Sequence, residues 1–243
     1  MNRVYCFITR HYHWLLEPYV HFHDKYWGYP LTIVTDVPLT FDTHHTVMEM
    51  PEYCNHFYQD DMGRMVKEVI NQFPEPLVTI SLPDFWVCSE VDIFQMNKLE
   101  LYIAKNSKIA RTHLWSGMGE GGRREDVIQE IDGMVVNRVS PYDPHIGQLG
   151  ATSGLLAIWN KEFLNYYFTD GWTWADLELS TERFAKEEYD TGRWYSVITD
   201  PALVDINHVC LTAKKELAKI ESLNDEEKQY ARQFIPEGYE ICE

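Results

Sequence analysis

The chain has 243 residues, enough for one large domain or two small ones with a sizeable buried core. Hydrophobic residues make up 45% of it and charged residues 24%, so its composition excludes disordered and fibrous proteins. The sum of 21 Lys and Arg against 38 Asp and Glu gives a net charge of −17. A surface this acidic repels phosphate backbones and anionic lipids over its whole field.

Neither a membrane span nor a signal peptide is expected. No window approaches the roughly 18 apolar residues that a bilayer-spanning helix needs. The apolar run at residues 4–8 is shorter than the roughly 7–15 residues of a signal-peptide core, and Arg3 and Arg10 bound it. The five cysteines are widely spaced without a CxxC pair, which is typical of reduced thiols. We therefore expect a cytoplasmic protein.

The first part of the chain alternates strand and helix signals. Residues 4–9 form a short apolar run typical of a buried strand, and apolar side chains then recur at helical spacing between residues 15 and 27. Residues 31–35 predict a second strand, which ends at Asp36. This strand–helix–strand order predicts a parallel pair in one sheet.

A strongly amphipathic helix and a third strand follow. Apolar residues between 62 and 73 draw one stripe along a helix, with Asp60 or Asp61 as its cap and Pro74 as its end. Residues 77–82 predict a buried strand that runs into a turn, Pro83-Asp84-Phe85-Trp86. A helix over 91–105 and a strand over 108–115 are expected next.

The second half is less regular. The glycine- and charge-rich stretch 116–126 predicts a mobile loop, either an inert insertion or a lid. After it we expect a weak strand at 135–136, a turn-rich stretch at 140–150, a strand at 155–159 and a helix from residue 161. Residues 211–234 predict a charged helical tail. We expect one α/β domain, with a mostly parallel central sheet flanked by helices, an irregular second half and C-terminal helices.

The histidines suggest a metal site, but ring packing is the favoured interpretation. His11 and His13, His21 and His23, and the adjacent His44-His45 are the candidate groups. Two histidines separated by one residue share a face in a strand, which suits zinc, but not in a helix, where His21 and His23 are expected. We therefore expect surface or ring-packing histidines.

Three carboxylates are better candidates for a functional site. Asp84 directly follows a buried strand, which is where ligands bind in open α/β sheets, although a turn residue is the alternative. Asp176 and Glu178 lie among the indoles of Trp172 and Trp174, where desolvation raises the pKa of a carboxylate and suits it to a general base. The alternative is a helix start, in which Thr173 and Asp176 form a capping box.

The order of these segments resembles that of GT-A-fold glycosyltransferases. More narrowly, Leu82-Pro83-Asp84-Phe85-Trp86-Val87 resembles the Leu-Asp-Asp-Tyr-Phe-Leu type motif of bacterial surface-polysaccharide and phage enzymes. Ala110-Arg111-Thr112-His113-Leu114 is similar to the family's arginine-containing strand end, and Leu155-Leu156-Ala157-Ile158-Trp159 to its tryptophan before a helix. Trp174-Ala175-Asp176-Leu177-Glu178 is similar to its Trp-x-x-Glu segment. The resemblance spans about residues 3–210.

The resemblance implies a glycosyltransferase with a nucleotide-sugar donor, expected to be a UDP-sugar, and Glu178 as the preferred general base. The donor half would be residues 1–115, the acceptor half 116–210 and the tail 211–243. Thr9, Arg10 and Asp36 would hold the nucleotide at the carboxyl edge of the sheet, over Asp84.

Pro83 replaces the first aspartate of the family's acidic pair. Asp84 could still hold Mg²⁺ or Mn²⁺ with oxygens from the diphosphate and water. Alternatively, Arg10, Arg64 or Arg111 would neutralise the leaving diphosphate without a metal.

The acceptor stays open between a glycan and a hydroxymethylated base of phage DNA. A glycan would explain the aromatic content of 14%, and the charge of −17 argues against a DNA groove. A non-catalytic sugar- or protein-binding module on the same fold is the rival interpretation.

Overall fold

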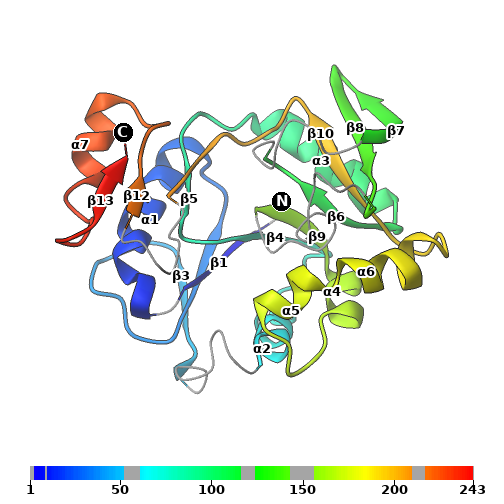
Figure 1. Ribbon diagram of the computed structural model, residues 1–243, viewed down its shortest axis with the longest axis horizontal. Coiled ribbons are helices and arrows are strands. Elements are labelled where there is room, and N and C mark those ends of the chain that lie inside the picture. The colour runs from blue at the N-terminus through cyan, green and yellow to red at the C-terminus, as the bar shows by residue number, and fades with distance from the viewer. Residues whose placement is uncertain are drawn as a thin grey trace.

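A computed structural model describes residues 3–8, 10–51, 61–115, 124–142, 156–209 and 217–242. A nine-stranded sheet crosses the molecule, with helices on both faces (Figure 1). Its strands in chain order are β1 (Val4–Ile8), β2 (Leu31–Thr35), β3 (Thr46–Glu49), β4 (Leu77–Ser81), β6 (Ile109–His113), β7 (Arg124–Ile131), β8 (Met134–Val139), β9 (Ala157–Asn160) and β10 (Tyr195–Asp200). In space the order is β3-β2-β1-β4-β9-β6-β10-β8-β7.

The sheet is mixed, with equal numbers of parallel and antiparallel neighbours, although seven of its nine strands run in the same direction, as a mostly parallel sheet predicts. Strands β3, β2, β1 and β4 pair in parallel, and β10 pairs in parallel with β6. Strand β9 lies antiparallel between β4 and β6, and β8 lies antiparallel to both β10 and β7. Strands from residues 1–115 and from residues 116–210 therefore belong to one sheet, and the chain has the expected α/β architecture.

Two apolar clusters hold the helices against the sheet. Along β1, Val4, Cys6 and Ile8 face the cluster that contains helices α1 (Leu16–Tyr26) and α3 (Ile93–Lys105). The alternate residues Tyr5 and Phe7 face the cluster of α2 (Met62–Ile70) and α4 (Lys161–Tyr167). The continuous apolar run of β1 follows from this, because a strand covered on both faces has no exposed side.

Local signals in the sequence explain where most of these helices begin. A 3-10 turn, η1 (Arg10–Leu15), leads into α1, and Pro18 lies in the first turn of α1, where its missing N–H costs nothing. Asp92 caps α3 and Asn160 caps α4, each accepting two backbone N–H hydrogen bonds. Asp61 stands at the start of α2 but makes no capping hydrogen bond, because its carboxylate accepts from the backbone of Gly171.

Two segments differ from the sequence prediction in the middle of the chain. Residues 85–87 form a short strand, β5 (Phe85–Val87), which pairs with β11 (Ile206–His208) and replaces part of the expected turn. Residues 124–126, expected in the mobile loop, open strand β7, and the other residues of that loop lie outside the described ranges. The β7–β8 hairpin turns at Asp132 and Gly133, both with positive φ.

The C-terminal tail is a correction to the sequence prediction, because only part of its described residues is helical. Strand β12 (Leu217–Lys219) pairs in parallel with β13 (Glu240–Cys242), and α7 (Asp225–Ala231) lies between them in the chain. Asn224 caps α7 and forms a capping box with Glu227. The remaining helices are α5 (Trp174–Leu179), α6 (Thr181–Phe184) and the π-helix η4 (Ala185–Tyr189). Among the described residues, no helix combines the length and hydropathy required to cross a bilayer.

Candidate functional site

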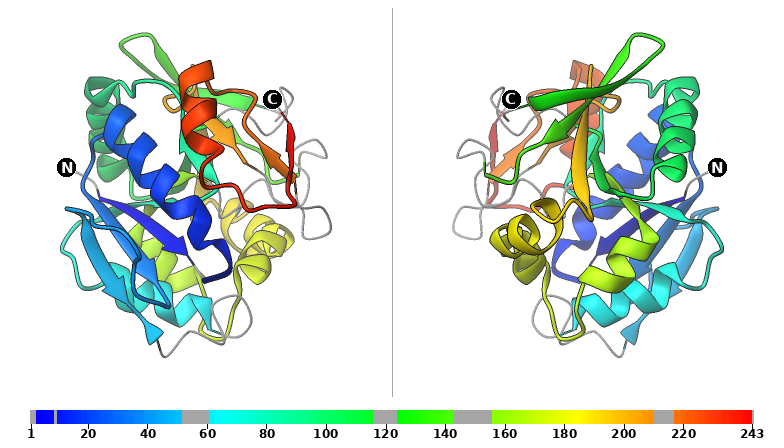
Figure 2. Two further views of the ribbon diagram at one scale, coloured as in Figure 1. Left: turned by 90° about the vertical axis from the view of Figure 1, so that its left-hand side faces the viewer. Right: turned by 90° about the vertical axis from the view of Figure 1, so that its right-hand side faces the viewer.

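The carboxyl ends of β1, β2 and β4 meet at one edge of the sheet. The register pairs Ile8 with Thr35 and Cys6 with Ser81, so the three strands end side by side. Figure 2 shows β1, in dark blue, pointing toward the side on which α5, α6 and the C-terminal strands also lie. The segments that carry Arg10, Asp36 and Asp84 leave the sheet at this edge, which is where open α/β sheets bind ligands.

Arg10 and Asp36 form one unit at this edge. The backbone N–H of Arg10 donates to Asp36 Oδ1 at 2.8 Å, and its guanidinium Nε donates to Asp36 Oδ2 at 3.2 Å. The Asp36 side chain is almost fully buried, whereas that of Arg10 is 43% exposed. Asp36 therefore fixes the turn after β1 and holds an accessible cation at the carboxyl edge.

A histidine next to this unit is held in its neutral form. His13, in η1, is hydrogen-bonded through Nε2 to Thr35 Oγ1 at 2.9 Å, at the end of β2. Burial lowers the pKa of His13, and the nearby Asp36 carboxylate opposes that shift. The neutral ring can donate or accept without adding charge.

Asp84 pairs with a histidine from the far end of the chain. His208 Nε2 donates to Asp84 Oδ2 at 3.2 Å, and the pairing of β5 with β11 brings the two residues together. The Asp84 carbonyl also accepts from the Val209 N–H at 2.9 Å. The His208 ring is stacked on Phe85, with centroids 4.5 Å apart, and meets the edge of Trp115. Aromatic packing therefore fixes the orientation of the imidazole.

The Asp84–His208 pair is open to solvent and lies beside β1. The side chains of Asp84 and His208 are 22% and 30% exposed, so the carboxylate does not point into the core. Asp84 follows β4, which pairs in parallel with β1. Burial raises the pKa of Cys6 in β1, and the Asp84 charge adds to that shift. Since β2, β1 and β4 are neighbours, Asp36 and Asp84 follow strands separated by two strand spacings, roughly 10 Å.

The chemistry of this pair fits a divalent cation that is shared with a ligand. One carboxylate and one imidazole provide two protein donors, and hard divalent cations complete their coordination with phosphate oxygens and water. Pro83 provides no donor, so the protein alone offers less than a full coordination shell. A diphosphate would have to supply the remaining oxygens.

The two other arginines of interest are differently placed. Arg64 lies in the first turn of α2, where its guanidinium pairs with Asp61 at 3.0 Å and with Glu68 at 3.8 Å. Arg111 lies in the middle of β6 and is fully buried; its Nη1 bonds His113 Nε2 at 2.5 Å, and its guanidinium lies over the Trp159 ring. The structure thus brings Arg10, Asp36 and Asp84 to one edge, whereas it places Arg111 inside the sheet.

The acidic pair, Asp176 and Glu178, lies on α5, and the segment that precedes α5 is hydrogen-bonded to α2. Thr173 caps α5, and Asp176 completes the expected capping box, with Oδ2 accepting from both the backbone N–H and the hydroxyl of Thr173 at 2.8 Å. Gly63 of α2 donates its backbone N–H to the Trp172 carbonyl at 3.0 Å. Glu178 belongs to α5, but its side chain lies outside the described part, as does all of Thr9.

His208 is the site residue that the sequence did not predict. No pattern around residue 208 marks it, because its partner Asp84 is 124 residues away. The contact depends on the β5–β11 pairing, and a three-residue strand has too little periodicity to be recognised alone.

Comparisons with known proteins find similarity to solved structures. No protein-family model matches the chain. No curated protein matches it either. Among solved structures, the glycosyltransferase GlyE of Streptococcus pneumoniae TIGR4 is similar at 9% identity and a TM-score of 0.38, over 100% of this chain and 45% of that chain. The chain thus spans less than half of that protein, and the similarity assigns it neither a family nor an activity.

Proposed function

We propose that this chain is a glycosyltransferase that takes a sugar from a nucleotide-sugar donor, expected to be a UDP-sugar, to a hydroxyl acceptor. The observation that carries the proposal is the Asp84–His208 pair, at 3.2 Å and open to solvent, beside the Arg10–Asp36 unit. A carboxylate, an imidazole and a half-exposed guanidinium at the carboxyl edge of parallel strands suit a nucleoside diphosphate. The resemblance of residues 3–210 to GT-A enzymes supports the same reaction.

The donor contacts follow from these placements. Arg10 would bind phosphate oxygens, because its side chain is accessible, and Asp36 would act through Arg10 as a positioning residue. Asp84 and His208 would hold Mg²⁺ or Mn²⁺ together with the diphosphate, and the cation would supply charge neutralisation for the leaving group. Arg111 is the weakest of the predicted phosphate ligands, because its side chain is fully buried.

The transfer needs a base for the acceptor hydroxyl. The acceptor oxygen bonds to the anomeric carbon while the bond from that carbon to the phosphate oxygen breaks, and the electron pair leaves with the nucleoside diphosphate. The hydroxyl proton passes to a carboxylate, for which we propose Glu178, because Asp176 is engaged with Thr173. A glycan is the favoured acceptor over a modified DNA base, since the net charge of −17 repels duplex DNA.

Thermal shift with UDP-, GDP- and CMP-linked sugars, with and without Mn²⁺, tests donor binding. One nucleotide class should stabilise the protein, by about 2.7 kcal/mol at a hundred times its Kd. Asp84→Asn and His208→Gln should lose the Mn²⁺-dependent part of the shift, whereas Asp225→Asn, an exposed carboxylate of α7, should keep it. An unchanged thermal shift in Asp84→Asn would show that the donor does not bind at this edge of the sheet.

Turnover distinguishes an enzyme from a binding module. Release of nucleoside diphosphate from the stabilising donor should fall about 10²–10⁴-fold in Glu178→Gln, with donor affinity nearly unchanged. Donor binding without turnover in the presence of glycan acceptors would favour the non-catalytic module. Retardation of duplex DNA in a gel would favour the DNA acceptor.

A further inference from the structure

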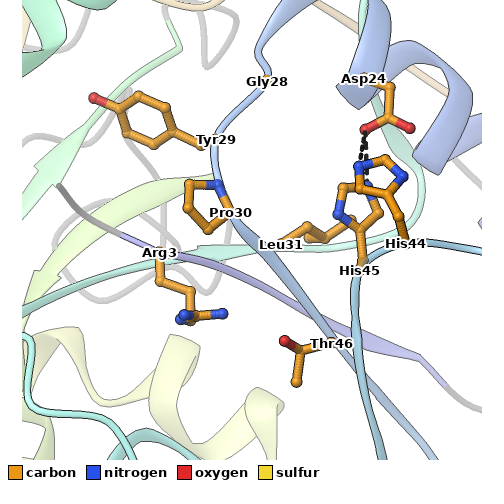
Figure 3. Close-up of a pocket in the computed structure, with 9 residues that line it drawn as sticks. All are labelled: Arg3, Asp24, Gly28, Tyr29, Pro30, Leu31, His44, His45 and Thr46. Carbon is orange, nitrogen blue, oxygen red and sulfur yellow. Dashed lines mark hydrogen bonds and ion pairs between the residues drawn. The ribbon is translucent and has the colours of Figure 1, made fainter.

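A second polar site lies at the opposite, amino-terminal edge of the sheet. A cavity of about 590 Å³ opens there between the start of β2, the segment before β3 and the end of α1. Figure 3 shows Asp24 of α1 at one end of this cavity, with the rings of His44 and His45 turned toward its carboxylate. Arg3 lies on another part of the wall.

Three metal-ligand side chains converge at this end of the cavity. His45 Nε2 lies 2.8 Å from Asp24 Oδ1, and His44 Nε2 lies 3.8 Å from the same oxygen. One ligand atom from each of the three side chains lies within 4.8 Å of the other two. The two imidazole rings are 4.0 Å apart between centroids, at an angle of 40°.

Hydrogen bonding alone explains only half of this arrangement. The His45 contact is an ordinary hydrogen bond to a carboxylate, and its side chain is only 5% exposed. His44 lies beyond hydrogen-bond distance and is 75% exposed, yet it too faces Asp24. A common ligand for both rings accounts for this convergence.

The spacing matches a four-coordinate cation after small side-chain shifts. With metal–ligand bonds of about 2.0–2.1 Å, the ligand atoms of a tetrahedral zinc site lie roughly 3.3–3.4 Å apart. The observed 2.8 and 3.8 Å lie on either side of that value, so each would change by about half an ångström. His44 and Asp24 have room to move because both are exposed to solvent, and the cavity leaves space for a water as fourth ligand.

The ligand types also favour a transition metal. Neutral imidazole is the form that binds transition metals, and two imidazoles with one carboxylate suit zinc better than magnesium or calcium, which prefer oxygen ligands.

We propose that Asp24, His44 and His45 bind a zinc-like divalent cation with one open coordination position. The cation would join α1 to the segment that precedes β3. Strand β3 is an edge strand that pairs only with β2 among the described strands, so this link would stabilise an otherwise weakly held part of the sheet. The site is independent of the proposed transferase reaction, because it lies at the other edge.

Zinc binding to the full-length protein, freed of metal with a chelator that is then removed, tests the proposal. Competition with a chromophoric chelator measures affinity and stoichiometry, and Co²⁺ in place of Zn²⁺ reports tetrahedral coordination by its visible absorption. His44→Ala is the sharpest variant, because an exposed side chain can be removed without disturbing the fold. Asp24→Asn and His45→Gln complete the set, with circular dichroism as a check of folding.

Loss of a residue that only hydrogen-bonds to a metal ligand typically lowers metal affinity about 10–100-fold. Each of the three ligand variants should lower zinc affinity by more than that. His21→Gln, on the same helix, should bind zinc normally, and so should His208→Gln. Zinc should also raise the melting temperature of the wild type but not of His44→Ala. Wild-type affinity in His44→Ala, loss of binding in His208→Gln alone, or no zinc binding at all would overturn the proposal.

Discussion

Replacement of Gly63 by alanine should destabilise the protein, although alanine is the better helix former. A Cβ built at Gly63 would lie 2.1 Å from the Thr169 carbonyl oxygen and 2.8 Å from its carbon. Ordinary contacts begin near 3.4 Å, so α2 and the backbone at residue 169 would have to separate by about 1.3 Å, the difference of 3.4 and 2.1. That movement strains the Gly63–Trp172 hydrogen bond at the entry to α5.

The magnitude follows from two opposing effects. Alanine gains up to about 1 kcal/mol over glycine in a helix, and less in a first turn. Overpacking costs about 1–3 kcal/mol, and more where the neighbour is backbone that cannot rotate away. We expect Gly63→Ala to lower the free energy of unfolding by about 1–2 kcal/mol.

Urea unfolding followed by tryptophan fluorescence measures this change. Glu68→Ala, on the same helix, is the matched control, because it removes an exposed ion pair to Arg64 at 3.8 Å and should change stability by less than about 0.5 kcal/mol. A Gly63→Ala protein as stable as the wild type would refute the close approach of α2 to the segment before α5.

Two further predictions concern Glu227, which is buried, and Cys88, which is partly buried. Burial acts to raise the pKa of Glu227, but hydrogen bonds from Lys25, Tyr26 and the Asn224 backbone lower it overall. Glu227→Gln should therefore lower the free energy of unfolding by about 1–3 kcal/mol at pH 7. The difference in urea midpoint between this variant and the wild type should shrink as the pH falls below 4.5, the ordinary pKa of a glutamate, because protonation of Glu227 removes the stability that its lowered pKa contributes. Burial, together with the charges of Asp205 and Glu227, raises the pKa of Cys88 from 9.0 to about 11. Iodoacetamide at pH 8 should therefore modify Cys88 about 100-fold more slowly in the folded protein than in the unfolded chain. Peptide mass spectrometry measures the two rates, and equal rates would contradict the prediction.

Sequence reasoning located the parts of the fold that carry their own signal. The apolar runs of β1, β2 and β4 predict buried strands because these strands are covered on both faces, and the stripe of α2 predicts one buried helix face. Once parallel strands are expected, the positions of Arg10, Asp36 and Asp84 at one edge follow from topology. Asp176 and Thr173 form the capping box that their spacing indicates.

What the sequence did not predict depends on contacts between distant segments. Strands β3 and β11 have three or four residues, and they are strands only because β2 and β5 offer them hydrogen bonds. The burial of Arg111 depends on β9 and β10, which lie on either side of β6. Likewise, His44 and His45 gain a partner only because α1 carries Asp24 to the same end of the sheet.

The long separation between Asp84 and His208 has a consequence for the synthesis of this protein. Ribosomes release the N-terminal strands first, and β1, β2 and β4 are complete long before residue 208 is made. The sheet edge that holds Arg10 and Asp36 can therefore form early, whereas the histidine half of the pair arrives only after 124 further residues. A nascent chain, or one cut before residue 208 by a protease, would have the strands that frame the proposed site but not the histidine partner of Asp84.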